Sequence, residues 1–406
     1  MSKRERTPFP KGYWTIWSTV ALDLVGFGIV VPILGIYAKR FGAHGVTVGL
    51  LFASFSLAQF VCAPLLGKLS DRIGRKPVIV ISLLGTAVAS FVTGAANVLW
   101  LLFLGRIIDG GSGASLAVAQ AAVGDMAEPK DRPRLMGMLG AAFGIGFVVG
   151  PALGGLASLG GAHVPFYVAG VLALINAIAA IIRVPETRKP GAAAGHVHAG
   201  APVHAPSGKL HAVTPALRQL AIVGFVTTVA FTAFEATFAL FGHARFGFGI
   251  GGSAWIFVGV GVVLVVVQGG GYGQLVKKFG VHPLYVGGVA LVVVGLVAMS
   301  VATVWPVLLV ALFVLSVGQG FASPSITTLV GEYAPPHRRG EAMGFQQSAT
   351  AIGRIVGPPV AGWMFDHTGI WSPYAAAAAL CALAVVLLFW WGFQRPPAVA
   401  PADAVR

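Results

Sequence analysis

The sequence predicts an all-α integral membrane protein with twelve transmembrane helices in two pseudo-symmetric six-helix bundles. Three observations lead to this fold class. Of the 406 residues, 56% are apolar and only 10% are charged, against roughly 25% charged in soluble domains. Twelve apolar stretches are long enough, at about 20 residues each, to cross a ~30 Å hydrocarbon core. The two halves of the chain also repeat each other's motifs.

Each stretch is apolar on all sides rather than on one face, which is typical of a helix in lipid. In the first half we expect spans near residues 13–37, 47–66, 77–96, 98–122, 135–158 and 164–182. In the second half we expect them near 218–241, 253–276, 283–303, 305–330, 342–364 and 371–393. The first span is too long for the apolar part of a signal peptide, and no small-residue cleavage site follows it. We therefore expect it to remain as a helix.

The basic residues predict the orientation. A net charge of +14 would suggest a nucleic-acid partner in a soluble protein, but here the basic residues lie between the apolar runs, where they suit lipid headgroups. On the side of the two termini the connections hold 22 of the 27 Lys and Arg residues, and the opposite side holds three. The positive-inside rule then predicts a multi-pass protein of the inner (cytoplasmic) membrane with both termini in the cytoplasm.

A long connection divides the chain. Residues 184–217 are rich in Pro, Gly, Ala and His, which predicts a flexible cytoplasmic linker between a bundle at 1–183 and a bundle with a short tail at 218–406. Four histidines in it raise the alternative of a metal site, but no cysteine or carboxylate joins them and the segment has no structure to fix ligand geometry. We expect neither a metal nor a cofactor. The four are His196, His198, His204 and His211.

An internal repeat supports the two bundles. A shift of 207 residues places GGSGASLAVAQAAVGDMAEP, from Gly110, over VGQGFASPSITTLVGEYAPP, from Val317. The same shift places GFVVGPALGG over GRIVGPPVAG, which begin at Gly146 and Gly353. Six spans return the chain to its starting side, so the repeats have one orientation. Parallel repeats are typical of transporters with a site at the midplane between the halves.

The connection between spans two and three has the sequence GKLSDRIGRKP. Its glycines permit a tight turn and close helix approach. Its acid can cap a helix N-terminus, while its basic residues can pair with acids of a neighbouring span. A plain topology signal is the alternative, but the pattern is too ordered for that. The residues of this latch motif are Gly67, Asp71, Arg72, Gly74, Arg75 and Lys76, with Asp125 as the expected acidic partner.

Span five contains GFGIGFVVGPALGGL. Glycines every four residues give it a helix face without side chains, and a proline permits a bend. Helix packing alone would explain the glycines, but not the full pattern. The residues of this glycine motif are Gly146, Gly150, Pro151, Gly154 and Gly155.

The latch motif strongly resembles the signature loop of the major facilitator superfamily, in which this loop is a cytoplasmic latch that stabilises the outward-facing state. The glycine motif, and LDLVGFGIVVPIL in span one, resemble motifs of the superfamily's twelve-helix drug/proton antiporters, above all the tetracycline and multidrug efflux branch. LGRIIDGGSGA in span four resembles the motif with a membrane arginine that is implicated in proton handling. Arg106 matches that arginine, and Asp109 stands where the family has a neutral residue.

Five charged residues at membrane depth are the candidate functional residues, because a charge there is costly unless it is paired or hydrated. Asp23 lies roughly 14 Å into span one. Arg106 and Asp109 share one face of span four, where a static ion pair and a proton relay are both open. Glu235 lies in the outer half of span seven and Arg354 in the centre of span eleven.

The chain lacks the P-loop pattern G-x-x-x-x-G-K-[ST], so we expect an ion gradient to supply the energy. Together with the resemblance, this implies a monomeric proton-coupled antiporter that exports tetracycline-like or other amphipathic or cationic drugs by alternating access. Asp23 or Glu235 would hold either a proton or the positive charge of the small-molecule substrate. Which aromatic residues face that substrate stays open among Phe27, Phe55, Phe60, Phe143, Phe231, Phe234, Phe238 and Tyr272.

Two alternatives compete with this function. A major facilitator symporter or uniporter for a small metabolite such as a sugar is the first, and the glycine motif argues against it. An intramembrane enzyme is the second. Neither H-E-x-x-H nor G-x-S-x-G is present, and a single-site enzyme would have no use for duplicated halves. We expect no enzymatic activity.

Overall fold

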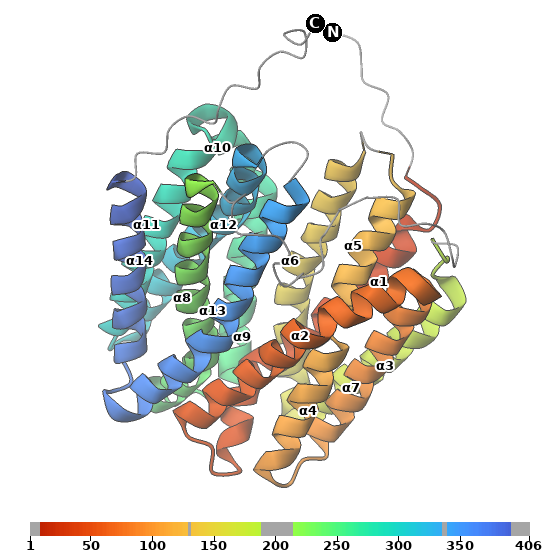
Figure 1. Cartoon of the computed structure of the whole chain (residues 1–406). Helices are drawn as coiled ribbons and strands as arrows, with labels where there is room; N and C mark the ends of the chain where they lie inside the picture. Colours follow the sequence, from red (N-terminus) through yellow and green to blue (C-terminus); the bar gives the residue numbers. More distant parts are fainter. Residues whose placement is uncertain (1–8, 129–130, 188–213, 335–338, 391–406) are drawn as a thin grey trace, which may run out of the picture.

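The computed structural model describes residues 9–128, 131–187, 214–334 and 339–390, which form helices joined by short connections (Figure 1). The central part of the expected linker, with its four histidines, lies outside the described residues. Lys3, Arg4, Arg6, Lys130, Arg395 and Arg406 also lie outside the described residues.

The first half contains the six expected spans, and its fourth is interrupted. Between α4 and α5 the run from Gly110 to Gly113 includes three glycines, which are poor helix formers. Gly113 leaves helical geometry with ψ 45°. The helices are α1 (Tyr13–Lys39), α2 (Gly45–Ile73), α3 (Arg75–Gly94), α4 (Leu99–Ser112), α5 (Ser115–Met126), α6 (Arg132–Ala157) and α7 (Val164–Arg183), with a 3₁₀ turn η1 (Ser158–Gly160) after α6.

The second half also contains six spans, and a π-turn at another glycine run lies inside its second span. A π-turn widens the backbone and shifts the register of the side chains that follow. The helices are α8 (Pro215–Phe246), α9 (Ile250–Val266), the π-turn η3 (Val267–Gly271), α10 (Tyr272–Phe279), α11 (Val281–Ser300), α12 (Trp305–Tyr333), α13 (Arg339–His367) and α14 (Ser372–Trp390).

Eleven spans in the described part of the chain are both long and apolar enough to cross a membrane. The twelfth, α13, has 29 residues but is more polar, since it carries Gln346, Gln347, Thr350 and Arg354. This helix packs between α8 and α2, where Gln346 and Thr350 are buried. The predicted all-helical membrane fold is confirmed.

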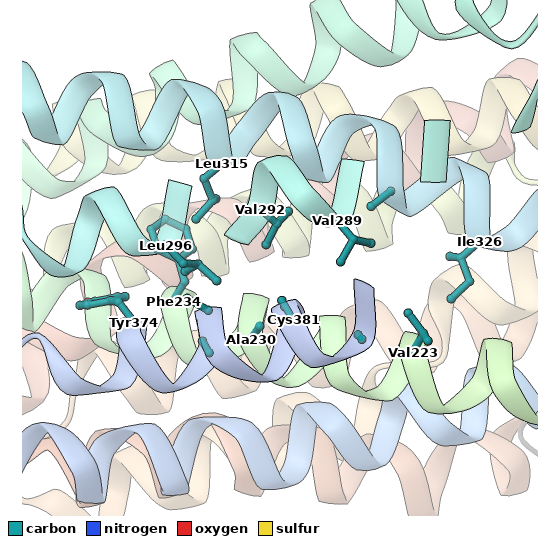
Figure 2. Close-up of a cluster of buried hydrophobic side chains, with 14 of the residues drawn as sticks. Val223, Ala230, Phe234, Val289, Val292, Leu296, Leu315, Ile326, Tyr374 and Cys381 are labelled. Carbon is teal, nitrogen blue, oxygen red and sulfur yellow. The ribbon is translucent and has the colours of Figure 1, made fainter. Parts of the chain in front are cut away.

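The two halves repeat the same packing. In the first half α1 packs on α6 and α7, and α3 packs on α4 and α7. In the second half α8 packs on α13 and α14, and α11 packs on α12 and α14. Apolar side chains from these helices meet in a core within each half. Figure 2 shows part of the second, where Phe234, Val289, Leu296, Leu315 and Tyr374 come together from four helices. The domain boundaries at residues 183 and 218 stay a prediction.

We call the side on which α1 begins the terminal face and the side on which α1 ends the distal face. The halves meet through α2 with α13, through α6 with α9, and through α1 with α8. In Figure 1 the two groups of helices converge toward the distal face, at the bottom, and separate toward the terminal face, at the top.

The α6–α9 interface shows where this separation begins. Gly155 packs against Ala254, with 3.3 Å between that residue's Cβ and a carbon placed on the glycine, and a carbon placed on Gly144 would lie 2.7 Å from the Val265 Cγ2. One turn further toward the terminal face, Gly140 and Gly269 have no atom within 4 Å of such a carbon. The molecule is therefore closed at the distal face and open at the terminal face.

A carboxylate reinforces the distal closure. Gly45 and Val46, at the beginning of α2, both donate backbone hydrogen bonds of 2.8 Å to the Asp366 carboxylate at the end of α13. This negative charge lies at the positive end of the α2 dipole, which is a stabilising position. A single residue of one half thus holds a helix of the other.

Candidate functional site

A polar cluster lies inside the first half, where α1, α4 and α5 meet. Asp23 of α1 accepts a hydrogen bond from the Ser115 hydroxyl at the beginning of α5. The Asp23 carboxyl is also close enough to Asp109 for the two negative charges to repel each other. We call Asp23, Arg106, Asp109 and Ser115 the carboxylate cluster.

Arg106 is buried, with 3% of its surface exposed. Its Nη1 forms an ion pair of 2.9 Å with Asp109 Oδ2, and its guanidinium carbon lies 4.2 Å from the centre of the Phe55 ring on α2. The Nε atom of Arg106 has no hydrogen-bond partner in the described part of the chain. This arginine is therefore committed to Asp109, which leaves Asp23 with a neutral partner in Ser115.

The interruption between α4 and α5 positions this cluster. Gln59 of α2 donates a hydrogen bond of 3.0 Å to the Gly113 carbonyl, which the interruption frees from the helical ladder. Gly110 packs directly on α2, since a carbon placed on it would lie 2.9 Å from the Phe55 carbonyl carbon. These contacts hold the beginning of α5, and with it Ser115, beside α1.

The two charges of the second half are arranged differently. Glu235 on α8 and Arg354 on α13 are half-buried and interact electrostatically, but they form no ion pair within 4.0 Å. Glu235 follows the beginning of its helix by twice as many residues as Asp23 follows the beginning of α1. It therefore lies nearer the distal face than Asp23. We call Glu235 and Arg354 the α8–α13 charge pair.

The latch motif forms a compact network on the terminal face. The buried Arg75 side chain pairs with Asp71 and with Asp125, each at 2.9 Å, and donates a bond of 2.7 Å to the Ser70 hydroxyl. Gly74 has φ 106°, a backbone conformation that glycine adopts without strain. The Arg72 side chain is exposed. All the contacts of Arg75 are within the first half, so in this conformation the motif joins α2, α3 and α5.

Glu186, just after α7, completes this network and was not anticipated. Its carboxylate accepts backbone hydrogen bonds from Arg75 at 2.9 Å and from Lys76 at 3.2 Å. These groups begin α3, so Glu186 caps that helix, the role considered for Asp71. No sequence signal identifies it, because an acid after a span is common.

The glycine motif is sandwiched between two helices. Gly146, Gly150 and Gly154 face α1, and a carbon placed on Gly150 would lie 2.7 Å from the Gly28 Cα. Gly155 faces α9 of the other half. The consecutive glycines thus serve two interfaces, one within the first half and one between halves. Pro151 continues α6 without ending it.

The aromatic candidates divide by burial. Phe234 and Phe238 are almost fully buried within the second-half core, so they are packing residues. Phe27 and Phe231 are only partly buried and pack against that core from its edge. Phe27 and Phe231 therefore remain candidates for contact with a substrate, as do the partly buried Phe55, Phe60 and Tyr272 and the exposed Phe143.

The comparisons with known proteins agree with this architecture. The family model described as Major Facilitator Superfamily matches residues 16–276 and 271–406. The chain belongs to the Major Facilitator Superfamily. It is thus a multi-pass membrane transporter and not an enzyme.

The transporter is similar to proteins named for drug resistance. It is 32% identical over 352 residues to tetracycline resistance protein, class C, of Escherichia coli, with 84% of this chain and 87% of that protein covered. It is 28% identical over 391 residues to multidrug resistance protein 2 of Bacillus subtilis (strain 168), with 94% and 96% covered. Among solved structures, the human organic anion transporter MFSD10 (TETRAN) aligns with a TM-score of 0.70 and 26% identity, covering 93% of this chain and 98% of that chain.

Proposed function

We propose that this transporter is a proton-coupled antiporter that exports tetracycline-like or other amphipathic or cationic drugs across the cytoplasmic membrane. The observation that carries this proposal is the environment of Asp23. Its carboxyl lies at membrane depth and has a hydroxyl as its hydrogen-bond partner, because the nearby arginine is paired with Asp109. The similarity to tetracycline and multidrug resistance proteins supports the drug class.

In the proposed cycle, Asp23 holds a proton in one state and loses it in the other. An ionised carboxylate in an apolar region needs a counter-charge, and no cation is committed to Asp23. Loss of its proton therefore favours a cationic substrate nearby, and return of a proton releases it. Arg106 keeps Asp109 neutralised as an ion pair through both states. Glu235, in the second half, supplies a second negative charge that attracts cationic substrates.

The terminal face is the cytoplasmic side in this proposal. The excess of Lys and Arg in its connections supports this orientation. The open terminal face then makes the described conformation inward-facing, ready to take drug from the cytoplasm. Opening of the distal face would release the drug outside in exchange for protons.

Everted membrane vesicles with an imposed pH gradient test this function, with radiolabelled tetracycline and a cationic dye as probes. We expect gradient-dependent uptake of the probes by vesicles with the wild-type protein and none by vesicles with Asp23→Asn. Glu235→Gln should reduce uptake of the cationic dye more than uptake of a neutral probe. Glu332→Gln removes an exposed carboxyl at the terminal end of α12 and serves as the matched control.

Proton release on adding drug to the detergent-solubilised protein assigns the coupling group. Asp23→Asn should abolish the release if Asp23 carries the exchanged proton. Undiminished release would place coupling elsewhere, with Asp109 next to be replaced. Transport that persists without any pH gradient would instead support the uniporter alternative.

A further inference from the structure

The side chain of Arg354 belongs to the face of α13 that meets the first half. Pro358, Gly362 and Asp366 follow it at intervals of four residues, and residues four apart share a helix face. Each of these three contacts α2: the first two pack against its backbone, and Asp366 caps its beginning. Of these four residues, Arg354 lies nearest the terminal face, and it makes no such contact with α2.

Glu235 occupies the matching place on α8. Ala239, four residues later on the same face, packs against Gly35 of α1, with 3.7 Å between its Cβ and a carbon placed on the glycine. Glu235 and Arg354 thus each lie one turn, roughly 6 Å, on the terminal side of a contact that closes the distal face. The α8–α13 charge pair therefore lies directly inside the distal closure.

Neither member of the pair is satisfied by the protein. Within the described residues, Glu235 and Arg354 have no hydrogen bond and no ion pair, although they attract each other. None of their polar atoms is among the fully enclosed atoms that lack a partner, so both groups reach accessible space. Arg106 and Asp109, by contrast, are in contact at 2.9 Å. Two opposite charges held apart in a membrane protein leave a place for a ligand that satisfies both.

Two partly buried aromatic rings lie on α8 and α1, on the terminal side of the Gly35–Ala239 contact. Phe231 precedes Glu235 by one turn on the same face of α8, and Phe27 of α1 packs at the edge of the second-half core. Phe27 also contacts Phe55, with 5.8 Å between the ring centres. Partly buried rings next to a charged group suit a molecule with a flat apolar body and a polar edge.

We propose that Glu235 and Arg354 form a two-charge binding site for planar amphipathic zwitterions. The cationic group of the ligand lies against the Glu235 carboxylate, its anionic group lies in the planar fork of the Arg354 guanidinium, and its ring system lies on Phe27 and Phe231. This inference rests on the proposed export function, since it names the class of compound that the export site takes.

Two dyes that differ in one group test the site. Tetramethylrhodamine carries a carboxylate beside its cationic ring system, and its methyl ester is the cation alone. Fluorescence anisotropy on the detergent-solubilised protein, without any gradient, measures both affinities. We expect the wild-type protein to bind the zwitterion about tenfold more tightly than the ester. Arg354→Gln should remove that preference by weakening the zwitterion alone, whereas Glu235→Gln should weaken both dyes.

Matched variants separate this effect from damage to the fold. Arg354→Lys keeps the charge and should retain most of the preference, and Arg245→Gln, which removes an exposed charge near the distal end of α8, should change neither affinity. Unchanged ester binding by Arg354→Gln would show that the protein is intact. The proposal is overturned if the wild-type protein binds both dyes equally or neither, or if Arg354→Gln weakens both to the same extent.

Failure of this proposal and failure of the export proposal are distinguishable. Binding is measured without a pH gradient, so absent proton-driven efflux would leave the dye preference in place. Normal proton-driven efflux by a protein with no preference between the dyes would refute the two-charge site and leave the antiporter standing.

Discussion

Replacing Asp366 by Ala should shift the conformational equilibrium away from the conformation in which the distal face is closed. The Asp366 carboxylate accepts two backbone hydrogen bonds of 2.8 Å from the beginning of α2, across the interface that closes the distal face. These bonds exist only while that face is closed. Their removal therefore destabilises one conformation and leaves the other unchanged.

The magnitude follows from the geometry. Loss of a helix N-cap costs about 0.5–2 kcal/mol, and a charge at a helix end contributes about 0.3–1 kcal/mol at an exposed site. Asp366 is exposed, so solvent screens its charge, and we take about 1 kcal/mol for the whole interaction. That corresponds to a roughly fivefold change in the ratio of the two conformations. Asp366→Asn retains an oxygen acceptor and should give a smaller shift.

Spin-label distance measurements across the distal face can detect this change. Arg40 and Arg245 are exposed at the distal ends of the two halves and suit replacement by labelled cysteines. The native Cys62 and Cys381 would be replaced by Ala in the background. The short-distance population should then fall relative to the long-distance population by about fivefold in Asp366→Ala.

Two results would refute this reasoning. An unchanged distance distribution in Asp366→Ala would mean that the cap contributes nothing to closure. A shift of equal size in Glu332→Gln, whose exposed carboxyl lies on the terminal face, would mean that the equilibrium responds to net charge rather than to the cap. Asp366→Glu offers a further comparison, because it keeps the charge but changes the reach.

Three further predictions concern other parts of the molecule. Gly49→Val should remove the short-distance population almost completely and abolish transport, because a carbon placed on Gly49 would lie 2.6 Å from the Pro358 carbonyl carbon; a retained short distance would contradict this. Asp71→Asn should lose drug uptake by everted vesicles while membrane insertion stays normal, since Asp71 orients Arg75 in the latch motif, and full uptake would reduce the motif to a topology signal. A cysteine at His44 should react with an impermeant thiol reagent in intact cells, whereas one at Gly200 should not. His44 suits labelling because it is exposed, and labelling at Gly200 from outside would reverse the orientation.

The candidate site was only partly readable from the sequence. Asp23, Arg106 and Asp109 stand out because a charge at membrane depth is rare and costly. Ser115, Glu186 and Asp366 do not stand out, since each is an ordinary polar residue until its partner is known. Their hydrogen bonds join residues that are 92, 111 and 321 positions apart. No local pattern carries such information.

The spans themselves could be predicted because lipid imposes a local rule. A backbone in hydrocarbon must satisfy its hydrogen bonds within its own helix, so each crossing needs its own apolar run of about 20 residues. This rule did not predict the interruption at Gly113 or the π-turn at Val267–Gly271. Each lies in a glycine-rich run, but neighbouring helices decide whether such a run stays helical.

The conformation was decided by the tertiary structure alone. The sequence determined twelve spans, their duplication and an orientation signal in the basic connections, because each of these depends on local composition or on comparison of the halves. Closure of the distal face depends on contacts between helices of different halves, such as Gly49 with Pro358 and Gly155 with Ala254. The proposed alternating-access cycle requires the two closures to lie within a few kcal/mol of each other. The same sequence therefore encodes both states, and only packing between the halves distinguishes them.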